Sequence, residues 1–291
     1  MTNQLKLTIT KTVLITGCSS GIGKATAKLL ATKGFNVIAT MRKPQLETEL
    51  NQLDNVIVLP LDVTNLNSIQ NAITLGIERF GRIDVIVNNA GFAVGGPFET
   101  ATSEQLTRQF ETNVGGVMNC TKAILPHFRA NKSGIIINIS SMGGRVSFPY
   151  YSLYNSTKWA VDGFSEALQY ELRQFGIKVK VVEPGAIKTD FYSRSQVSSV
   201  DNSLSDEATN AYKTTFAKVK AQFDEVGSGG ADVEIVANCI HRAITDGSNK
   251  LRYTCGMDAK ISLFLKWLLP NQLFFGILHA ITNTMTKRAS K

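Results

Sequence analysis

Short runs of hydrophobic residues, rich in valine and isoleucine, alternate with longer stretches of helical spacing from Thr12 onward. Each run is followed by a turn and then by one of these stretches, a pattern typical of a parallel sheet with helices on both faces. The runs are apolar at nearly every position, as in strands that are buried on both sides. We predict seven strands, at residues 12–16, 36–40, 56–60, 85–88, 134–139, 179–183 and 250–254.

No segment of linker composition divides these elements, so we predict one α/β domain over residues 1–291 with a doubly wound parallel sheet. A polar stretch, residues 193–206, carries six serines and two aspartates and interrupts the pattern before the last strand. Ligands of such a sheet bind beyond the carboxyl ends of its strands, where an insertion can cover the pocket. We therefore expect residues 191–230 to form an insertion that covers the substrate.

The last part of the chain, residues 257–291, is expected to form an apolar helical extension. Its two apolar runs, 261–269 and 273–281, are interrupted by Lys266 and separated by Pro270-Asn271-Gln272. Neither run reaches the roughly 20 residues of a membrane-spanning helix, so we expect no transmembrane span. Packing on the sheet edge or on a second subunit is the favoured interpretation, and peripheral contact with a membrane surface is the alternative.

Charge and cysteine content narrow the classes of function. The 291 residues carry a formal net charge of +8, but the basic residues are scattered and match no nucleic-acid-binding motif. We expect a solvated basic surface and no nucleic-acid partner. The four cysteines lie far apart without the pairing of metal ligands, so free thiols and no metal site are predicted. The N-terminus has no apolar secretory segment, and a cytoplasmic location is expected.

A glycine-rich turn follows the first predicted strand, where Thr16-Gly17-Cys18-Ser19-Ser20-Gly21-Ile22-Gly23 leads into a helix expected over residues 24–33. Glycine at positions 17, 21 and 23 lets backbone amides approach a pyrophosphate and lets the helix pack closely on the strand. Such a turn alone is a weak signal, because many tight turns carry glycine for steric reasons. The strand before it, the helix after it and a second strand ending near residue 40 favour a dinucleotide site.

The residues after the second strand indicate which dinucleotide binds, because an acidic residue there would bond the ribose 2′-hydroxyl and repel a 2′-phosphate. This chain has Thr40-Met41-Arg42-Lys43 and no carboxylate. Arg42 can bond a 2′-phosphate and Lys43 adds positive potential, which favours NADP(H), with NAD(H) as the alternative. A basic pair that only solubilises a loop would give the same sequence. Asp62-Val63 is expected to cap the adenine pocket, and Asn88-Asn89-Ala90-Gly91 is expected to form the cavity floor.

Tyr154 and Lys158 stand four residues apart in a stretch, residues 153–175, whose spacing predicts a helix. Their side chains therefore share one face, and an ammonium close to a phenol lowers the pKa of the phenol from about 10 toward the working range. Tyr154 can then exchange a proton with a substrate oxygen. Ser141, after the strand at 134–139, is placed to bond the same oxygen. A surface pair on a helix is the other interpretation of this tyrosine and lysine.

These motifs together resemble those of the short-chain dehydrogenase/reductase family. The resemblance covers about residues 11–190, with residues 250–256 similar to the family's last strand, and rests on motifs in the family's order: Thr16 to Gly23, Asn88 to Gly91, Asn113, Ser141, Tyr154-x-x-x-Lys158 and Pro184-Gly185. It implies a Rossmann-type sheet of seven strands and a homodimer or homotetramer. It also implies a catalytic tetrad, formed by Asn113, Ser141, Tyr154 and Lys158.

The resemblance assigns further roles. Lys158 would also contact the nicotinamide ribose, and Asn113 would hold a water that connects the lysine to solvent. The turn residues Ser19, Ser20 and Ile22 would lie against the dinucleotide, and the nicotinamide would be contacted by Pro184, Gly185, Ile187 and Thr189. One position departs from the pattern, since NADP-specific relatives often carry a second basic residue where this chain has Ser20.

The sequence therefore predicts an oxidoreductase, a carbonyl reductase or ketoreductase, that transfers hydride between NADP(H) and a ketone, aldehyde or secondary alcohol, with Tyr154 as general acid/base. A hydrophobic substrate is expected because apolar and aromatic residues flank the catalytic motifs, namely Phe92, Met142, Phe148, Pro149, Tyr150, Phe191 and Tyr192. The local sequence also loosely resembles hydroxysteroid and retinol dehydrogenases. The alternatives are an NAD-dependent alcohol or hydroxysteroid dehydrogenase and a non-enzymatic dinucleotide-binding regulator.

Overall fold

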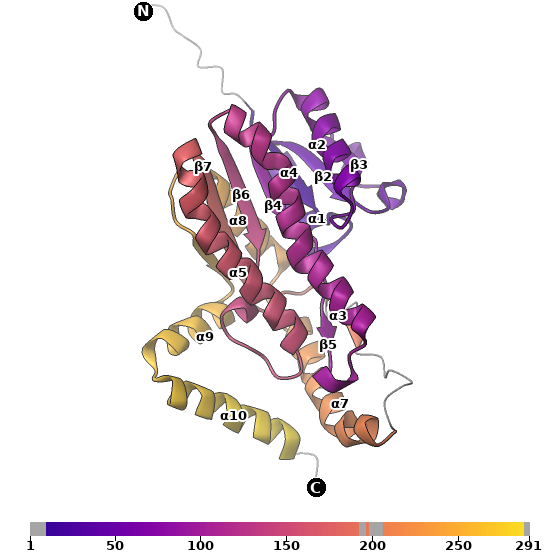
Figure 1. The fold of residues 1–291 in the computed structure, drawn as a ribbon, viewed down its shortest axis with the longest axis vertical. Coiled ribbons are helices and arrows are strands. Elements are labelled where there is room, and N and C mark those ends of the chain that lie inside the picture. Colours follow the sequence, from indigo (N-terminus) through magenta and orange to yellow (C-terminus); the bar gives the residue numbers. More distant parts are fainter. Residues whose placement is uncertain (1–9, 192–195, 198–205, 288–291) are drawn as a thin grey trace, which may run out of the picture.

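Seven parallel strands form one sheet in the order β3-β2-β1-β4-β6-β7-β9 (Figure 1). The structure is a computed structural model that describes residues 10–191, 196–197 and 206–287. The strands are β1 (Thr12–Thr16), β2 (Asn36–Met41), β3 (Val56–Pro60), β4 (Val85–Asn88), β6 (Gly134–Ile139), β7 (Ile177–Pro184) and β9 (Arg252–Cys255). The predicted doubly wound α/β fold is confirmed, and the largest shifts are the earlier start of β7, at Ile177, and the later start of β9, at Arg252.

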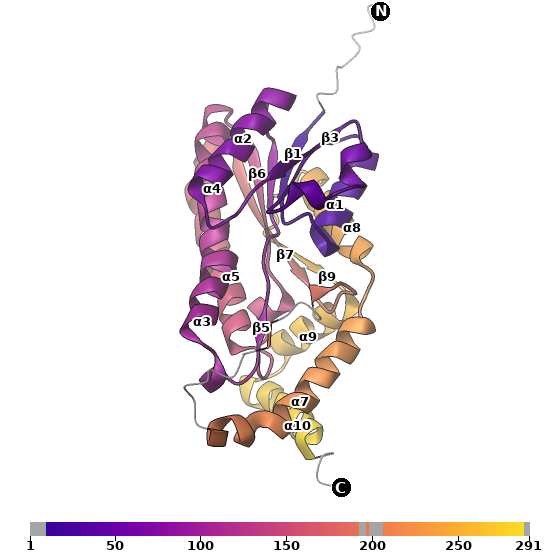
Figure 2. The same cartoon turned by 90° about the vertical axis from the view of Figure 1, so that its right-hand side faces the viewer.

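Helices cover both faces of this sheet (Figure 2). One face is covered by α2 (Leu66–Phe80), α4 (Gly116–Ala130) and α5 (Ser152–Leu172), and the other by α1 (Gly21–Thr32) and α8 (Val233–Thr245). In β1, Leu14 packs in the core on the α2, α4 and α5 side, whereas Val13 and Ile15 pack in the core under α1 and α8. A strand between two helical layers must therefore be apolar at every position, as the sequence pattern indicates.

Further elements lie beyond the carboxyl ends of the main strands (Figures 1 and 2). They are α7 (Asp206–Ser228), α9 (Met257–Leu268), α10 (Asn271–Lys287) and a small parallel pair of strands, β5 (Val94–Gly95) and β8 (Gln196–Val197). Helix α7 falls in the expected insertion at 191–230, of which residues 192–195 and 198–205 lie outside the described part of the chain. Across the ranges that the structure describes, no helix combines the length and apolar character needed to cross a bilayer.

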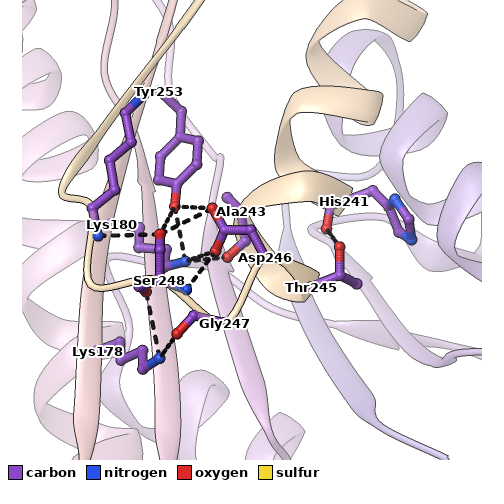
Figure 3. Close-up of polar contacts among 10 residues, drawn as sticks. Lys178, Lys180, His241, Ala243, Thr245, Asp246, Gly247, Ser248 and Tyr253 are labelled. Atoms are coloured by element: carbon purple, nitrogen blue, oxygen red, sulfur yellow. Dashed lines mark hydrogen bonds and ion pairs between the residues drawn. The ribbon is translucent and has the colours of Figure 1, made fainter.

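A buried polar network joins α8 to β7 and β9 (Figure 3). Lys180 is only 1% exposed although it carries a charge. Its ammonium donates to the carbonyl oxygen of Ala243 (2.6 Å), a carboxylate oxygen of Asp246 (2.8 Å) and the hydroxyl oxygen of Tyr253 (2.9 Å). The Tyr253 hydroxyl donates in turn to the other oxygen of Asp246 at 2.6 Å. Because an ammonium has three protons, these acceptors satisfy it and allow its burial.

The pKa of Asp246 lies below its ordinary value. Burial would raise this pKa, but hydrogen bonds from Lys180, Tyr253 and Ser248 stabilise the carboxylate and outweigh burial. The stability that Asp246 contributes is therefore fully present above the pKa of the group in the unfolded chain, about 3.9, and is lost as the pH falls through the lower folded-state pKa.

We expect Asp246→Asn to lower the free energy of unfolding at pH 7 by about 1–3 kcal/mol, because the buried ammonium of Lys180 loses its charged acceptor. Urea unfolding would measure this loss, and the difference from wild type should shrink as the pH falls below about 3.9, the pKa of an aspartate in the unfolded chain. The double variant Asp246→Asn/Lys180→Met should regain part of the stability, since no charge remains buried. A double variant as unstable as the single one would contradict this account.

Candidate active site

A cavity of about 660 Å³ lies at the carboxyl ends of the strands, the edge at which doubly wound sheets bind their ligands. Its wall is formed by the segments that follow β1, β2, β3, β4, β6 and β7, together with residues of α5, α7 and α10. Every residue that the sequence predicts to react or to bind the dinucleotide lines this cavity, except Gly23, Lys43, Asn88 and Asn113. Motifs spread over most of the chain therefore meet in one place.

Side-chain hydrogen bonds lock together the two loops at the dinucleotide end. The Thr16 hydroxyl oxygen accepts from the backbone N–H groups of Asn89 and Ala90, both at 3.0 Å. The Asn89 amide donates to the carbonyl oxygens of Thr16 (2.8 Å) and Gly17 (3.1 Å). Gly17 has a φ of +74°, and a Cβ there would lie 2.9 Å from the Cα of Ala90. Only glycine allows this close approach.

Helix α1 begins at Gly21, earlier than the predicted start at residue 24. The unpaired N–H groups of its first turn therefore belong to the glycine-rich turn, and Gly21 and Ile22 line the cavity, where such groups can bind phosphate. Gly23 serves packing instead. A Cβ there would lie 2.6 Å from the amide nitrogen of Asn89 and would collide with the carbonyl of Gly17.

Arg42 follows β2 directly and lines the cavity, as do Asp62 and Val63. The Asp62 carboxylate accepts from the backbone N–H of Thr64 (2.9 Å) and from its hydroxyl (2.7 Å). Burial would raise the pKa of Asp62, but these bonds and the charge of Arg42 hold the pKa below its ordinary value. Lys43 does not line the cavity, so Arg42 alone of the predicted basic pair is part of its wall.

Tyr154 and Lys158 both reach the cavity from α5. The Lys158 ammonium nitrogen lies 5.7 Å from the centre of the Tyr154 ring and donates to the carbonyl oxygen of Ile139 at 2.8 Å. This carbonyl belongs to the last residue of β6, so the sheet itself holds the ammonium in position. Ser141 lies just beyond, lines the same cavity, and its hydroxyl oxygen accepts from the backbone N–H of Gly143 at 3.0 Å.

Burial lowers the pKa of Lys158 from 10.5 to about 8, and the charge of Asp162 opposes this shift. Asp162 is itself buried, one helical turn after the lysine, and accepts a hydrogen bond from the Ser140 hydroxyl. Burial raises the pKa of Asp162 to about 6, which nearby Glu183 also favours, while Ser140 and the arginines at positions 252 and 145 oppose it. Asp162 was not predicted from the sequence, although its spacing of four from Lys158 is a signal of a shared helix face.

Asn113 lies on a single π-helical turn (Glu111–Gly115) that joins α3 (Ser103–Phe110) to α4. Its side-chain nitrogen donates to the carbonyl oxygen of Phe92 (2.8 Å) and to the hydroxyl of Thr157 (3.1 Å). Its side-chain oxygen accepts from the Phe92 N–H at 3.1 Å. The side chain thus ties the loop after β4 to α5, and π-helical turns of this kind often occur at functional sites.

The segment after β7 is fixed by contacts with the C-terminal part of the chain. The Gly185 N–H donates to the carbonyl oxygen of Cys255 at 2.9 Å, and the Ala186 N–H donates to the Asp258 carboxylate at 2.7 Å. A Cβ at Gly185 would collide with that carboxylate, so glycine is required there. Ile187 forms a bridge with Ala231. Asp258 was not singled out from the sequence, because no local pattern links it to residues 185–186.

The wall of the cavity around Tyr154 is largely apolar, and Arg108, whose guanidinium lies 5.3 Å from the centre of the Phe92 ring, also lines the cavity. Five of the seven apolar residues predicted to flank the site line it: Phe92, Met142, Phe148, Pro149 and Phe191. Tyr150 does not line it and packs on Phe216 instead, with ring centres 5.8 Å apart, and Tyr192 lies outside the described residues. The wall also contains residues that the sequence analysis missed: Tyr151 before α5, Phe223 and Val226 of α7, and Leu278 of α10.

The family model described as short chain dehydrogenase matches residues 11–199, more than half of the chain. The chain belongs to the short-chain dehydrogenase family. The predicted family membership is thereby confirmed, and with it the class of oxidoreductases. The 3-ketodihydrosphingosine reductase of Bacteroides thetaiotaomicron is 43% identical over 67% of this chain and 71% of that protein. An oxidoreductase of Botryotinia fuckeliana is 40% identical over 86% of this chain and 90% of its own length.

Solved structures of the family share this architecture. A short-chain dehydrogenase from Streptomyces avermitilis superposes with a TM-score of 0.76 at 33% identity, and 96% of each chain is covered. The structure of ElxO with NADP bound has a TM-score of 0.67 at 29% identity, over 84% of this chain and 97% of that one. Both superpositions cover more of this chain than the family model does, so the single-domain Rossmann-type fold applies to most of the chain.

We expect Asp162→Asn to move the alkaline limit of enzymatic activity to lower pH by about 1 unit. The Asp162 charge raises the pKa of Lys158, so its removal lets burial lower that pKa further, and the ammonium is lost at lower pH. The profile of kcat/KM against pH would measure the shift.

Glu166→Gln is the matched control, because Glu166 lies on the same helix, is half-exposed and also pairs with Arg252. It should leave the profile unchanged. An equal shift in both variants, or none in Asp162→Asn, would contradict the role of Asp162.

Proposed function

We propose that this chain is an NADP(H)-dependent carbonyl reductase that transfers hydride between the nicotinamide and a hydrophobic ketone, aldehyde or secondary alcohol. The observation that carries the proposal is the pairing of Tyr154 with the buried ammonium of Lys158 in the wall of the cavity that also contains the glycine-rich turn. A phenol next to a held ammonium is a proton donor and acceptor at neutral pH.

A dinucleotide fits the residues present. The continuous cavity extends from Gly17, Gly21 and Arg42 to Tyr154 and Gly185, and the first turn of α1 offers N–H groups for the pyrophosphate. Arg42 and the absence of a carboxylate in residues 40–43 support NADP(H), as does the likeness to ElxO, whose structure holds NADP. Ser20, in place of a second basic residue, leaves NAD(H) as the second candidate.

In the direction of reduction, the bound nicotinamide would supply the hydride to the carbonyl carbon. The Tyr154 hydroxyl donates its proton to the carbonyl oxygen, which completes the alcohol, and the reverse direction returns the proton to Tyr154. Lys158 stabilises the phenolate by its charge, and the Ile139 carbonyl fixes where that charge lies. The Ser141 hydroxyl donates to the same substrate oxygen. The Asn113 side chain ties the π-helical turn before α4 to Thr157 of α5.

A hydrophobic substrate is supported by the aromatic end of the cavity. The rings of Tyr151 and Phe223 lie 4.5 Å apart, and Phe148 lies 6.1 Å from Phe223, so α7 and the segment before α5 close over an apolar space. Phe191 lies 5.6 Å from the Tyr154 ring and brings this wall up to the reacting group. The likeness to a 3-ketodihydrosphingosine reductase supports a carbonyl compound with a long apolar chain. Helix α7 then acts as the substrate-covering insertion.

The same proposal includes the assembly and the location expected from the sequence. We infer a homodimer or homotetramer from the family resemblance. A cytoplasmic location agrees with the four cysteines, which are all buried free thiols.

We expect Tyr154→Phe to lower carbonyl-dependent oxidation of NADPH by about 10²- to 10⁴-fold while NADPH still binds, because only the proton donor is lost. The oxidation is followed by absorbance, and binding by fluorescence titration. Tyr170→Phe is the control on the same helix, since Tyr170 is 72% exposed. Activity of Tyr154→Phe near that of wild type would end the proposal.

We expect Arg42→Ala to raise the KM for NADPH by about 10- to 100-fold, because the charge-assisted hydrogen bonds to the 2′-phosphate are lost. The KM for NADH, which has no 2′-phosphate, should rise much less. Lys43→Ala serves as the control, because Lys43 does not line the cavity, and it should have a small effect on both cofactors. Equal changes for NADPH and NADH in Arg42→Ala would favour the NAD-dependent alternative.

A further inference from the structure

Helices α9 and α10 have an apolar side that nothing in the described chain covers. At six positions on them the large apolar side chains are between 45% and 76% exposed: Ile261, Phe264, Trp267, Leu268, Leu273 and Phe275. We call these residues the α9–α10 face. The two helices extend from the end of the molecule beyond the sheet (Figure 1). Apolar clusters of this kind on a protein surface mark interaction sites.

The exposed residues are not a loosely packed core, because the core side of the same helices is already occupied. Leu263 and Phe274 are buried and pack with Val146, and Phe148 and Leu278 pack against this cluster. The Lys266 ammonium donates to the carbonyl of Arg145 and fixes α9 to the same loop. In α9 the exposed Ile261, Phe264 and Leu268 thus lie on the side opposite the buried Ala259 and Leu263, whereas in α10 the exposed Leu273 and Phe275 flank the buried Phe274.

The charges of this segment favour an anionic partner. Residues 257–291 contain five lysines and arginines and one acidic residue, Asp258. That carboxylate accepts from the Ala186 N–H, and of the basic residues Lys266 is likewise engaged with the body of the protein. Lys260 is exposed on α9. A second copy of the chain in a two-fold dimer would bring the same basic segment against itself with no acidic residue to pair with it.

We propose that the α9–α10 face docks on the surface of an anionic phospholipid bilayer, with the two helices lying in the plane of the interface. Apolar residues with lysine and arginine, and a tryptophan, are the composition of helices that bind in this way. With 12 and 17 residues and Pro270 between them, the helices rest on the bilayer instead of crossing it.

The α9–α10 face lies close to the cavity, so docking would bring the cavity to the membrane surface. The role of this docking rests on the proposed function. Leu278 of α10 lines the cavity, so the helix that contacts lipid on its outer side forms a cavity wall on its inner side. An apolar carbonyl compound dissolved in the bilayer then has a short path to Tyr154. Docking narrows the substrate class to membrane-dissolved lipids.

The test is flotation of the full chain with vesicles of phosphatidylcholine alone or of an equal mixture of phosphatidylcholine and phosphatidylglycerol. We expect binding to the anionic vesicles, at least tenfold weaker binding to the neutral ones, and release by salt. Phe264→Glu/Trp267→Glu should weaken binding about tenfold or more, because two side chains lose their apolar contact with lipid. Leu66→Glu, at a 60% exposed apolar position on α2, is the matched control and should bind as wild type does.

Wild type that fails to bind, or binds both vesicles equally, overturns the proposal. So does sedimentation showing a dimer that Phe264→Glu/Trp267→Glu converts to monomers without any vesicle binding, because the face would then join two copies. Matching thermal melting curves verify that the variants fold. Vesicle binding needs no turnover, so Tyr154→Phe should still float if only the proposed reaction is wrong, and turnover of a small water-soluble ketone should persist if only the docking is wrong.

Discussion

The burial of one ammonium group beside a phenol is the interaction on which the whole site depends. Burying an ammonium without a hydrogen-bond acceptor is energetically costly. The carbonyl oxygen of Ile139, at the end of β6, is the acceptor for Lys158. The charge of the nearby Asp162 raises the pKa of Lys158 and so opposes the effect of burial. The sheet, helix α5 and the buried carboxylate of Asp162 therefore all act on the ionisation of Lys158, whose ammonium lies 5.7 Å from the centre of the Tyr154 ring.

The dinucleotide end of the site is organised by a different device, the direct bonding of two loops through Thr16 and Asn89. These contacts are made between groups of the protein itself, so holding the two loops together does not require a ligand. A preformed site loses less conformational entropy on binding than one that must order its loops. The two ends of the cavity are thus held by separate means, the burial of a charge at one end and hydrogen bonds between side chains and backbone at the other.

Much of the fold and of the candidate site could be predicted from local pattern. Strands buried on both sides are apolar at every position, and a spacing of four on a helix fixes which side chains share a face, as for Tyr154 and Lys158. What local pattern does not contain is which distant segments meet. Phe223 and Leu278 reach the cavity through the packing of α7 and α10, and the two-residue strands β5 and β8 are too short for any periodicity. The sequence can also predict too much: Lys43 is adjacent to Arg42 and was predicted to bind the cofactor, but it does not line the cavity.

The bond between Asp258 and the Ala186 N–H joins the first turn of α9 to the segment after β7. The C-terminal helices are consequently not an appendage that can be trimmed to obtain a smaller catalyst. A chain cut ahead of residue 257 would lose the carboxylate against which Gly185 packs, along with one wall of the cavity. Any shortened or fused version of this protein has to preserve that junction.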